Sequence, residues 1–330
     1  MQYSIVGTTG ISVSELCMGT MTFGGDADST ESQKMFNLCR DEGVNFFDCA
    51  NKYGDGKAEV ILGECIKDCR DEVVLITKGA SRVGSDPNQL GASRKHLMRE
   101  LEKSLQRLST DYIDFYFIHY FDPATSMETT LRFLDEAVKQ GKILHYGFSN
   151  WSAWQMMKAV HICRSNGLTP PDCIQPMYSL VKRQAEVEIL PMALDQKLGV
   201  VSYSPIGAGV LTGKYQDSEK EVVGRLHQKR YYQQRYDNQI YFDTAKRFVT
   251  LAQELGHDPA PLAIRWVMAH PAVTAPIIGA RNVEQLRSSL QAVSIPMTDE
   301  LYHRVAALSP SPAPANDRLE EQLDQANVLR

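Results

Sequence analysis

The sequence lacks the features that mark several large classes of protein. No apolar run among its 330 residues approaches the roughly 20 residues of a membrane-spanning helix. The amino terminus has no basic segment followed by a long apolar one, so we expect no signal peptide. No cluster of basic residues stands out and the net charge is -5, which argues against nucleic acid as a partner. These absences predict a cytoplasmic protein that engages neither a membrane nor nucleic acid.

Cysteines are few and scattered. The seven include one pair at helical spacing, Cys65 and Cys69, but no second Cys or His pair completes a zinc set. We therefore expect reduced thiols and no metal. A Gly-x-Gly-x-x-Gly turn after an early strand is also absent, which argues against a doubly wound dinucleotide-binding sheet.

Short β-branched and aromatic runs recur along the chain instead. They are too short for helices and too continuous for half-exposed strands, so they predict parallel strands buried on both faces. Helical patterns lie between them, and several of the strand starts are about 30 residues apart, the length of a βα unit. The eight runs are 15–19, 44–49, 73–78, 112–119, 143–150, 173–179, 199–205 and 275–280.

Eight strands alternating with helices predict an α/β fold, a closed (β/α)8 TIM barrel with extra helices at its C-terminal end. Residues 2–14 have the pattern of a small β-hairpin, which we expect to plug the floor of the barrel. We expect one barrel domain over residues 1–310 and a C-terminal tail over residues 311–330. A proline-rich stretch from residue 309 leads into this tail, which we expect to end in a short amphipathic helix.

Residues 215–239 interrupt the rhythm of strands and helices. This segment is polar, rich in Tyr, Arg and Gln, and has no clear apolar period. Structureless segments of this length in a compact domain are usually lids, binding loops or disordered. Two interpretations stay open here, a mobile lid and an excursion over the surface.

Four chemically distinct side chains lie at or just beyond the carboxyl ends of predicted strands, where the active sites of such barrels lie. Asp48, Lys78 and His119 end the second, third and fourth strands, and Tyr53 follows on the loop after the second. Each alone has an ordinary alternative, as a helix cap, a solvated charge, a core histidine or a packing ring. Their coincidence at equivalent strand ends predicts one catalytic site.

This set of side chains is suited to the polar reduction of a carbonyl group. Asp48 can pair with Lys78, and we expect the Lys78 ammonium to lower the pKa of the Tyr53 phenol. Tyr53 could then give a proton to a developing alkoxide while His119 orients the same oxygen. No strong nucleophile stands beside its own base, so covalent catalysis is less natural. The residues therefore predict hydride from a cofactor and a proton from Tyr53.

The chain resembles the aldo-keto reductase superfamily from about residue 3 to about residue 310. The stretches that carry the resemblance are FFDCANKYGDGKAEVILGE, LITK, GASRKHLMRELEKSLQRLSTDYIDFYFIH, GKILHYGFSNWSAWQ, IQPMYSL, VVSYSPIGAGVLTGKY and PIIGARNVEQL. The resemblance implies that Asp48, Tyr53, Lys78 and His119 form the catalytic tetrad. It also implies a small-molecule carbonyl substrate and a cofactor, NADP(H) or less often NAD(H), extended across the barrel mouth.

The same resemblance assigns the residues that hold the cofactor. Ser149, Asn150 and Gln175 would bond the nicotinamide carboxamide, and Tyr203 would stack on the ring, roles that suit polar amides and an aromatic face. An N-cap of the following helix is an alternative for Ser149 and Asn150, and both can hold. The other implied contacts are Gly19, Thr20, Met21, Asp48, Ser204, Pro205, Ile206, Gly207, Gly209, Lys214, Gly279, Ala280, Arg281 and Gln285.

The adenine end of this site decides the choice between the two cofactors. Gly279, Ala280 and Arg281 precede a predicted helix, whose N-terminus favours an anion. A guanidinium at Arg281 could pair with a 2′-phosphate, so we predict NADP(H) in preference to NAD(H), which stays possible. The family often carries Glu-Asn near the end of this helix, where this chain has Ser288 and Ser289. We therefore expect looser adenine recognition, through Gln285.

Aromatic side chains near the mouth predict the substrate pocket: Phe23, Tyr120, Phe121 and Trp151, with Met21 beside them. Such walls suit flat or apolar carbonyls and also stack on sugar faces, so simple aldehydes, aldoses and keto-sugars stay open. An NAD(P)+-dependent sugar or polyol dehydrogenase is the alternative reaction. The motifs also resemble the branch with the potassium-channel β subunits, where the fold is a regulatory partner. The sequence does not specify an oligomeric state.

Overall fold

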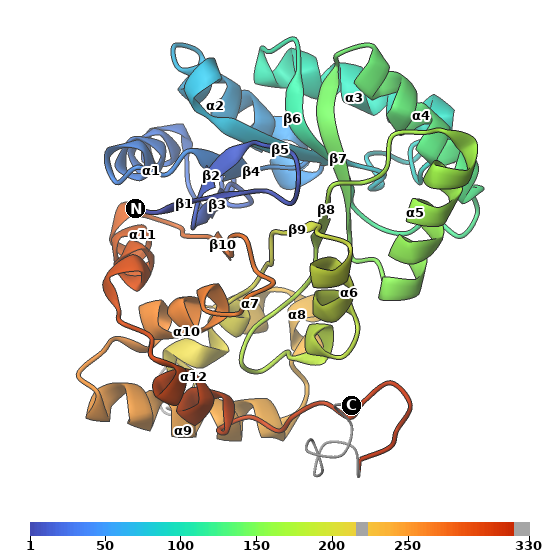
Figure 1. Ribbon diagram of the computed structural model, residues 1–330. Coiled ribbons are helices and arrows are strands. Elements are labelled where there is room, and N and C mark those ends of the chain that lie inside the picture. The colour runs from blue at the N-terminus through green and yellow to red at the C-terminus, as the bar shows by residue number, and fades with distance from the viewer. Residues whose placement is uncertain (216–223, 320–330) are drawn as a thin grey trace.

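A curled sheet of eight parallel strands forms the centre of the fold, with helices around it (Figure 1). The computed structural model describes residues 1–215 and 224–319. Hydrogen-bonded neighbours follow in the order β10-β3-β4-β5-β6-β7-β8-β9. The strands are β3 (Cys17–Gly19), β4 (Phe46–Asp48), β5 (Val74–Gly79), β6 (Ile113–Ile118), β7 (Ile143–Ser149), β8 (Cys173–Gln175), β9 (Gly199–Val200) and β10 (Ile277–Ile278).

Backbone hydrogen bonds also join the two ends of this series of strands. The amide of Thr274 donates to the carbonyl of Val200 at 2.9 Å, and the amide of Ile277 donates to the carbonyl of Ser202 at 2.7 Å. These bonds connect β10 and the residues before it to β9 and the residues after it. The predicted (β/α)8 TIM barrel is confirmed, with all eight strands within the predicted runs, apart from Gly79 at the end of β5.

Helices alternate with the strands and cover the outside of the barrel. The longer ones bury one apolar face; α3, for example, begins after the N-cap Ser93 and buries Leu97, Leu101 and Leu105. The helices are α1 (Ser29–Asp41), α2 (Lys57–Ile66), α3 (Arg94–Leu108), α4 (Met127–Lys139), α5 (Ala153–Asn166), α6 (Ile189–Asp195), α7 (Arg225–Gln228), α8 (Arg230–Arg235), α9 (Gln239–Glu254), α10 (Pro259–Met268), α11 (Val283–Leu290) and α12 (Asp299–Ala306). Short 3-10 turns are η1 (Tyr53–Gly56), η2 (Arg70–Glu72), η3 (Gln184–Glu186), η4 (Gly207–Thr212) and η5 (Gln291–Ser294).

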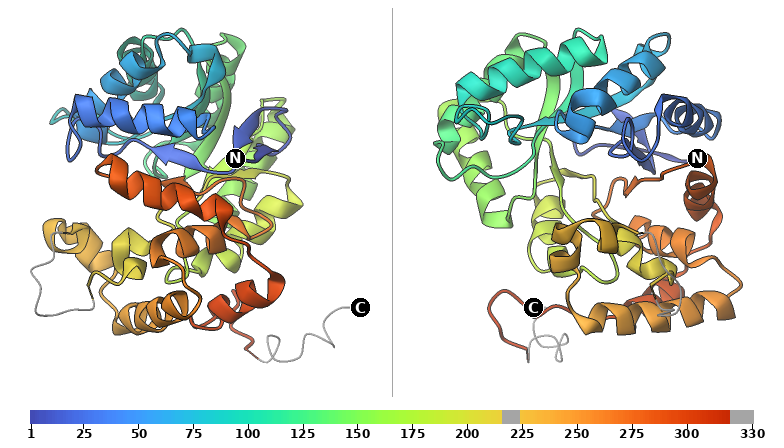
Figure 2. Two further views of the ribbon diagram at one scale, coloured as in Figure 1. Left: turned by 90° about the vertical axis from the view of Figure 1, so that its left-hand side faces the viewer. Right: turned by 180° about the vertical axis from the view of Figure 1, so that it is seen from behind.

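The later helices gather on one side of the molecule. Figure 2 shows α9, α10 and α12 together, on the side opposite α2 and α3. The indole of Trp266 in α10 donates to the carbonyl of Tyr302 in α12, and Arg304 in α12 pairs with Glu254 in α9. No helix within the described ranges combines the length and the apolar character needed to cross a membrane.

The N-terminal hairpin closes the floor of the barrel, as predicted. Its antiparallel strands are β1 (Tyr3–Ile5) and β2 (Ser12–Ser14), and Val6 and Val13 pack into the interior cluster of the barrel. Gly7 lies so close to the amino ends of β8 and β9 that a Cβ there would stand 2.9 Å from the amide nitrogen of Gly199. Its φ of +54° also favours glycine.

The segment 215–239 contains more regular structure than its sequence suggests. Within it, α7 and α8 form two short helices before α9 begins. Tyr232 and Tyr236 explain the difference, because both rings are buried and anchor this segment. The choice between a lid and a surface excursion stays a prediction. Part of the segment, 216–223, and the helix expected at the end of the tail, within 320–330, lie outside the described residues.

Candidate active site

The alternation of side chains along the strands brings the candidate residues to one mouth. In β5, Val74 and Ile76 belong to the interior cluster of the barrel, and Lys78 continues the same register. The same step of two residues, from an interior side chain to the mouth, leads from Phe117 to His119. The residues that stand two positions beyond an interior side chain are Asp48, Lys78, His119, Gln175 and Tyr203.

Lys78 lies at the centre of a buried charge pair. Its Nζ donates to both carboxylate oxygens of Asp48 at 2.6 Å and to the carbonyl of Cys49 at 2.7 Å. The hydroxyl of Tyr53 lies 3.3 Å from the same Nζ. The side chain of Lys78 is fully buried. The structure therefore brings together the aspartate, the lysine and the tyrosine that the sequence placed at one mouth.

The pKa of Tyr53 moves in the direction opposite to our expectation. Burial and the nearby Asp48 carboxylate raise the pKa of the phenol well above its usual range. The expected lowering by Lys78 is wrong because Asp48, in direct contact with the ammonium, offsets its charge, and burial then dominates. Tyr53 is thus held as a protonated phenol, the form required of an acid.

His119 completes the four residues. Its ring stacks on Tyr120 with the centroids 4.6 Å apart, and it meets the Tyr53 ring edge to face at 6.0 Å. Its Nδ1 lies 3.1 Å from the hydroxyl of Ser81. Burial and the charge of Lys78 lower the pKa of His119 to about 3, so the imidazole is neutral at ordinary pH.

A second buried network, which the sequence did not suggest, supports the loop that carries Tyr53. Glu59 in α2 is fully buried; it accepts from the Thr77 hydroxyl at 2.5 Å and from Arg107 Nε at 2.6 Å. Asn51 donates to the buried Glu100 of α3 at 3.0 Å. In the sequence, only the position of Glu59 on the apolar face of the predicted helix pointed to this network.

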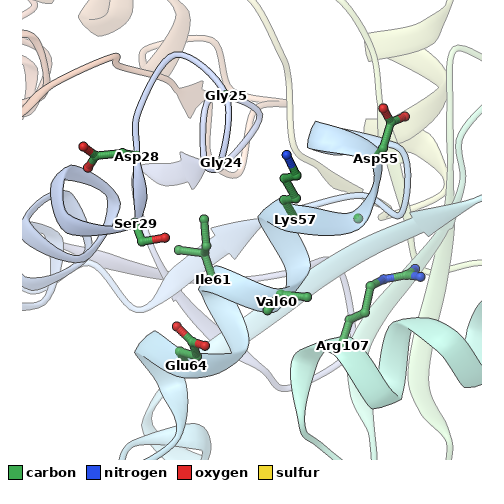
Figure 3. A pocket seen from close by; sticks show the side chains of 11 residues that line it. Gly24, Gly25, Asp28, Ser29, Asp55, Lys57, Val60, Ile61, Glu64 and Arg107 are labelled. Atoms are coloured by element: carbon green, nitrogen blue, oxygen red, sulfur yellow. The ribbon is translucent and has the colours of Figure 1, made fainter.

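A cavity of ≈ 560 Å³ lies on the outer side of this loop (Figure 3). Figure 3 shows Lys57 and Ile61 of α2 between the start of α1, at Asp28 and Ser29, and Arg107 of α3. Asp55 and Gly56 also line it, but none of the four catalytic candidates does. The cavity is therefore separate from the mouth where the catalytic candidates meet.

The side chains implied to hold the nicotinamide form one hydrogen-bonded chain. Asn150 donates to the His119 carbonyl at 2.9 Å and to the Ser149 hydroxyl at 3.1 Å, and it accepts from the Tyr203 hydroxyl at 2.6 Å. The Ser149 hydroxyl contacts Gln175, whose amide donates to Asp48 Oδ1 at 2.8 Å. The amide groups at the mouth are thus connected to the charge pair that contacts Tyr53.

The alternative role of Ser149 and Asn150 as a helix N-cap is wrong. Helix α5 begins at Ala153, and its N-cap is Ser152, two residues after Asn150. The backbone amide of Ser152 donates to the side chain of Gln155, which closes the first turn. Ser149 and Asn150 are therefore left to the mouth of the barrel.

Backbone strain collects around the same mouth. Of the eight non-glycine residues with positive φ in the described ranges, five follow strand ends there: Asp55, Ala80, Asn150, Ser204 and Ala208. Such conformations are costly and cluster at ligand sites. Gly207, Ala208 and Gly209 are successively left-handed, a backbone suited to an anion, and Lys214 lies across Gly209. These residues fit the diphosphate of a dinucleotide.

At the predicted adenine end, side chains of the protein already bind the groups that we expected to contact a 2′-phosphate. Arg281 pairs with Asp26 at 3.1 Å and donates to the side chain of Gln228 at 3.0 Å. At the N-terminus of α11, the amide of Val283 donates to Glu31 at 2.8 Å. Two carboxylates of the protein therefore hold the groups that we expected to meet a 2′-phosphate.

The serines at the end of α11 both contact the protein. Ser288 donates to Asp258 at 3.0 Å, and Ser289 donates to the carbonyl of Gln285 at 3.1 Å. The exposed Gln285 accepts from the Arg281 amide. This arrangement places the side chain of Gln285 beside Arg281, and its contact with adenine stays a prediction.

The other residues implied for the cofactor surround the mouth. The amide and the hydroxyl of Thr20 both donate to the carbonyl of Asp48. A side chain at Gly19 would meet Ile277 of β10 at 2.6 Å, which explains the glycine. Met21, Pro205, Ile206, Gly279 and Ala280 follow the ends of β3, β9 and β10.

The aromatic wall differs in part from the predicted one. Phe23 is fully buried in the core, so it presents no surface to a substrate and we withdraw it from the pocket. Trp151 is also buried, stacked on Phe148 at 3.8 Å, and supports the wall from behind. Tyr120 is exposed, and Phe121 contacts Trp151 and the exposed Trp154, a residue that sequence reasoning missed.

Helix α8 contributes two further groups that the sequence did not single out. Burial raises the pKa of Tyr120 and of Tyr203, and the nearby charge of Arg235 opposes this rise. Burial also raises the pKa of Tyr53, and the nearby Tyr232 adds a little to this rise. The neighbouring Tyr236 packs against the backbone of η4. The segment 230–236 therefore lies beside the mouth. In the sequence, only its high content of Tyr and Arg pointed to this role.

Known proteins resemble this chain over nearly its whole length. The model of the aldo/keto reductase family matches residues 15–310. YrpG of Bacillus subtilis, named an uncharacterized oxidoreductase, is 37% identical over 94% of this chain and 97% of its own. A protein of Oryza sativa subsp. japonica named "Probable voltage-gated potassium channel subunit beta" is 36% identical over 93% of this chain and 96% of its own. A similarly named protein of Schizosaccharomyces pombe is 30% identical over 92% of each chain.

Proposed function

This chain belongs to the aldo/keto reductase family, and from this premise we propose that it reduces an aldehyde or a ketone to the alcohol with NADPH. Tyr53 is the general acid in this proposal. One observation carries it: the Lys78 ammonium lies 3.3 Å from the Tyr53 hydroxyl and 2.6 Å from both carboxylate oxygens of Asp48. The proton donor is thus joined to a buried charge pair that can stabilise it after the proton leaves.

The residues at the mouth fit a nicotinamide dinucleotide. Ser149, Asn150 and Gln175 offer the donors and acceptors that a carboxamide needs, and Tyr203 offers a flat face. The left-handed backbone of η4 suits the diphosphate. When bound, the cofactor supplies the hydride, and the protein supplies the proton.

The protein residues move the proton and hold the oxygen that receives it. As the carbonyl carbon gains a hydride, its oxygen takes the proton of Tyr53, so one hydride and one proton convert C=O to CH–OH. Lys78 stabilises the phenolate that remains. The neutral His119 can hydrogen-bond the same oxygen, and the raised pKa of Tyr53 keeps its proton in place until the reaction.

Arg281 supports NADPH as the preferred donor, because a guanidinium matches phosphate oxygens well. Its present partner Asp26 is half exposed, and exposed ion pairs contribute little, so a 2′-phosphate can replace this carboxylate. NADH is the second candidate. The carboxylates of Asp26 and Glu31 favour it, because they repel an added phosphate.

Two other functions use the same residues. A sugar or polyol dehydrogenase would need Tyr53 as a base, which its raised pKa opposes at neutral pH. A regulatory subunit is suggested by the relatives named as potassium channel β subunits. The complete set of four catalytic candidates supports the reductase over this regulatory role.

A panel assay separates these functions. Purified full-length protein is mixed with NADPH and with aldehydes, ketones and keto-sugars in turn, and the loss of NADPH absorbance is followed, with NADH in parallel. Turnover of one class with NADPH supports the proposal, and an equal or higher kcat/KM with NADH overturns the cofactor preference. Oxidation of sugars or polyols without reductive turnover would point to the dehydrogenase. A co-purified cofactor that exchanges very slowly, without turnover, would point to the regulatory role.

A further inference from the structure

We propose that Ser81 fixes the tautomer of His119: its hydroxyl donates a hydrogen bond to Nδ1, so that Nε2 carries the hydrogen and faces the substrate. Ser81 is then a positioning residue, which acts through His119 and does not touch the reacting atoms. The inference rests on the proposed reduction, because the tautomer matters only if His119 donates to a carbonyl oxygen.

The contact between the two side chains is direct and buried. Ser81 Oγ lies 3.1 Å from His119 Nδ1, and only 6% of Ser81 and 9% of His119 is exposed. Among the residues that the structure describes, Nδ1 is the sole hydrogen-bond partner of this hydroxyl. If Nδ1 carried the hydrogen, the buried hydroxyl hydrogen would have no protein acceptor, which is costly. The hydroxyl therefore donates, and Nδ1 accepts.

The direction of this hydrogen bond decides what His119 offers at the mouth. The imidazole is neutral, so its two nitrogens share a single hydrogen. With Nδ1 as acceptor, the hydrogen resides on Nε2, which has no protein partner in the described ranges and is not among the buried unpaired atoms. An Nε2–H donates to a carbonyl oxygen, whereas a lone pair on Nε2 would repel it.

The backbone around Ser81 is built to hold the serine in place. Ala80 has a φ of +73°, a costly conformation for a residue with a Cβ. Its carbonyl accepts from the Gly91 amide at 3.1 Å, and the carbonyl of Ser81 accepts from His96 Nε2 at 3.2 Å. His96 itself is buried. Hydrogen bonds on both sides therefore keep the strained turn in the position from which Ser81 reaches His119.

Gly79 joins this turn closely to β6. The carbonyl of Gly79 accepts from the backbone amide of His119 at 3.0 Å. A Cβ at Gly79 would stand 2.1 Å from the hydroxyl of Tyr116, so no larger residue fits. The same short segment thus fixes both the backbone of His119 and the serine that contacts its ring.

Nitrogen NMR tests the tautomer directly, without any turnover. The full-length protein is labelled with nitrogen-15 at its eight histidines, and the signals of His119 are identified by their loss in His119→Gln. Near neutral pH we expect a protonated Nε2 and an unprotonated Nδ1 in the wild type. A protonated Nδ1 in the wild type would overturn the proposal whatever the catalytic activity, so the result is independent of the proposed function.

Variants at position 81 test whether Ser81 is what fixes the tautomer of His119. In Ser81→Ala we expect the nitrogen shifts of His119 to move toward a mixture of tautomers and kcat/KM for reduction to fall about tenfold, the effect of one lost hydrogen bond. Ser81→Thr should retain the wild-type shifts. Ser179→Ala is the matched control, because it removes a buried hydroxyl that has no partner in the described residues. Unchanged His119 shifts in Ser81→Ala would overturn the role of Ser81.

Discussion

At the scale of single residues, burial outweighs charge in setting the proton affinities at the mouth. Lys78, beside Tyr53, forms an ion pair with Asp48 at 2.6 Å, which offsets the charge of the ammonium. Burial therefore dominates and raises the pKa of the Tyr53 phenol. The same burial, with Lys78, lowers the pKa of His119 to about 3. The mouth therefore holds a protonated phenol beside a neutral imidazole.

The pH profile of reduction follows from these two directions. His119 has a lowered pKa and is uncharged above it, and Tyr53 has a raised pKa and keeps its proton below it. We expect kcat/KM for reduction to be level from about pH 5 to about pH 9, and the reverse oxidation to increase with pH. Initial rates across this range check the profile. A decline centred near the usual histidine pKa would contradict it.

The sequence alone was sufficient to predict the positions of the site residues that lie at strand ends. Asp48, Lys78 and His119 could be predicted because strand alternation alone brings them to the mouth. Ser81, Trp154 and the tyrosines of α8 reach the site through loop geometry and packing, which no local pattern encodes. The pKa of Tyr53 was mispredicted for a similar reason, since burial is a property of the folded chain.

At the scale of elements, α2 and α3 support the loop that carries Tyr53. The loop has left-handed backbone at Gly54, Asp55 and Gly56, so it needs outside support. A Cβ at Gly56 would stand 3.1 Å from the side chain of Arg107, which pairs with the fully buried Glu59. The ion pair between α2 and α3 therefore lies directly behind the loop that carries Tyr53.

Removal of the arginine should affect stability and catalysis together. Arg107→Ala leaves Glu59 buried without its charge partner, and we expect a loss of about 3 kcal/mol in the free energy of unfolding and a lower kcat. Urea unfolding with steady-state kinetics measures both. Arg94→Ala is the matched control: it breaks an exposed ion pair of α3 with Glu136, and we expect a loss below about 1 kcal/mol. Equal losses in the two variants would refute the support role.

We predict that Arg281, two residues before α11, sets the preference between NADPH and NADH. Arg281→Ala should weaken the preference for NADPH, whereas Asp26→Asn should strengthen it, because Asp26 competes with phosphate for the same guanidinium. The ratio of kcat/KM for NADPH to that for NADH measures this preference. Arg304→Ala, in an exposed pair with Glu254, is the control and should leave the ratio unchanged. Shifts of the same sign in Arg281→Ala and Asp26→Asn would contradict the competition.

At the scale of the whole molecule, the fold was largely predictable because its pattern repeats eight times. Each short buried strand alone is weak evidence for a fold. Eight such strands at regular intervals, alternating with helices, are compatible with few architectures other than a barrel. The segment 225–235 was harder, because its helices are short and are held by the buried rings of Tyr232 and Tyr236, not by a helical apolar period. The boundaries of the barrel domain at residues 1–310 and the tail stay predictions.

The hairpin plug gives a test of the barrel as one unit. Gly7→Ala must overcome both a positive φ and a Cβ position 2.9 Å from the backbone of the barrel floor, so we expect a loss of about 3 kcal/mol in the free energy of unfolding. Gly10→Ala, with φ +77° and open space around it, should lose about 1 kcal/mol. Thermal or urea unfolding compares them. Equal losses would mean that the hairpin does not pack tightly on the floor.

The activity of Tyr53→Phe on the best substrate of the panel tests whether Tyr53 is the general acid. This change keeps the ring and removes the proton. We expect kcat/KM for reduction to fall at least about a hundredfold while the affinity for NADPH, measured by fluorescence titration, stays the same. Tyr112, just before β6, donates its hydroxyl to Asp71, away from the mouth. Tyr112→Phe removes this hydroxyl and should keep full activity. Near-wild-type reduction by Tyr53→Phe would contradict the role of Tyr53 as the acid.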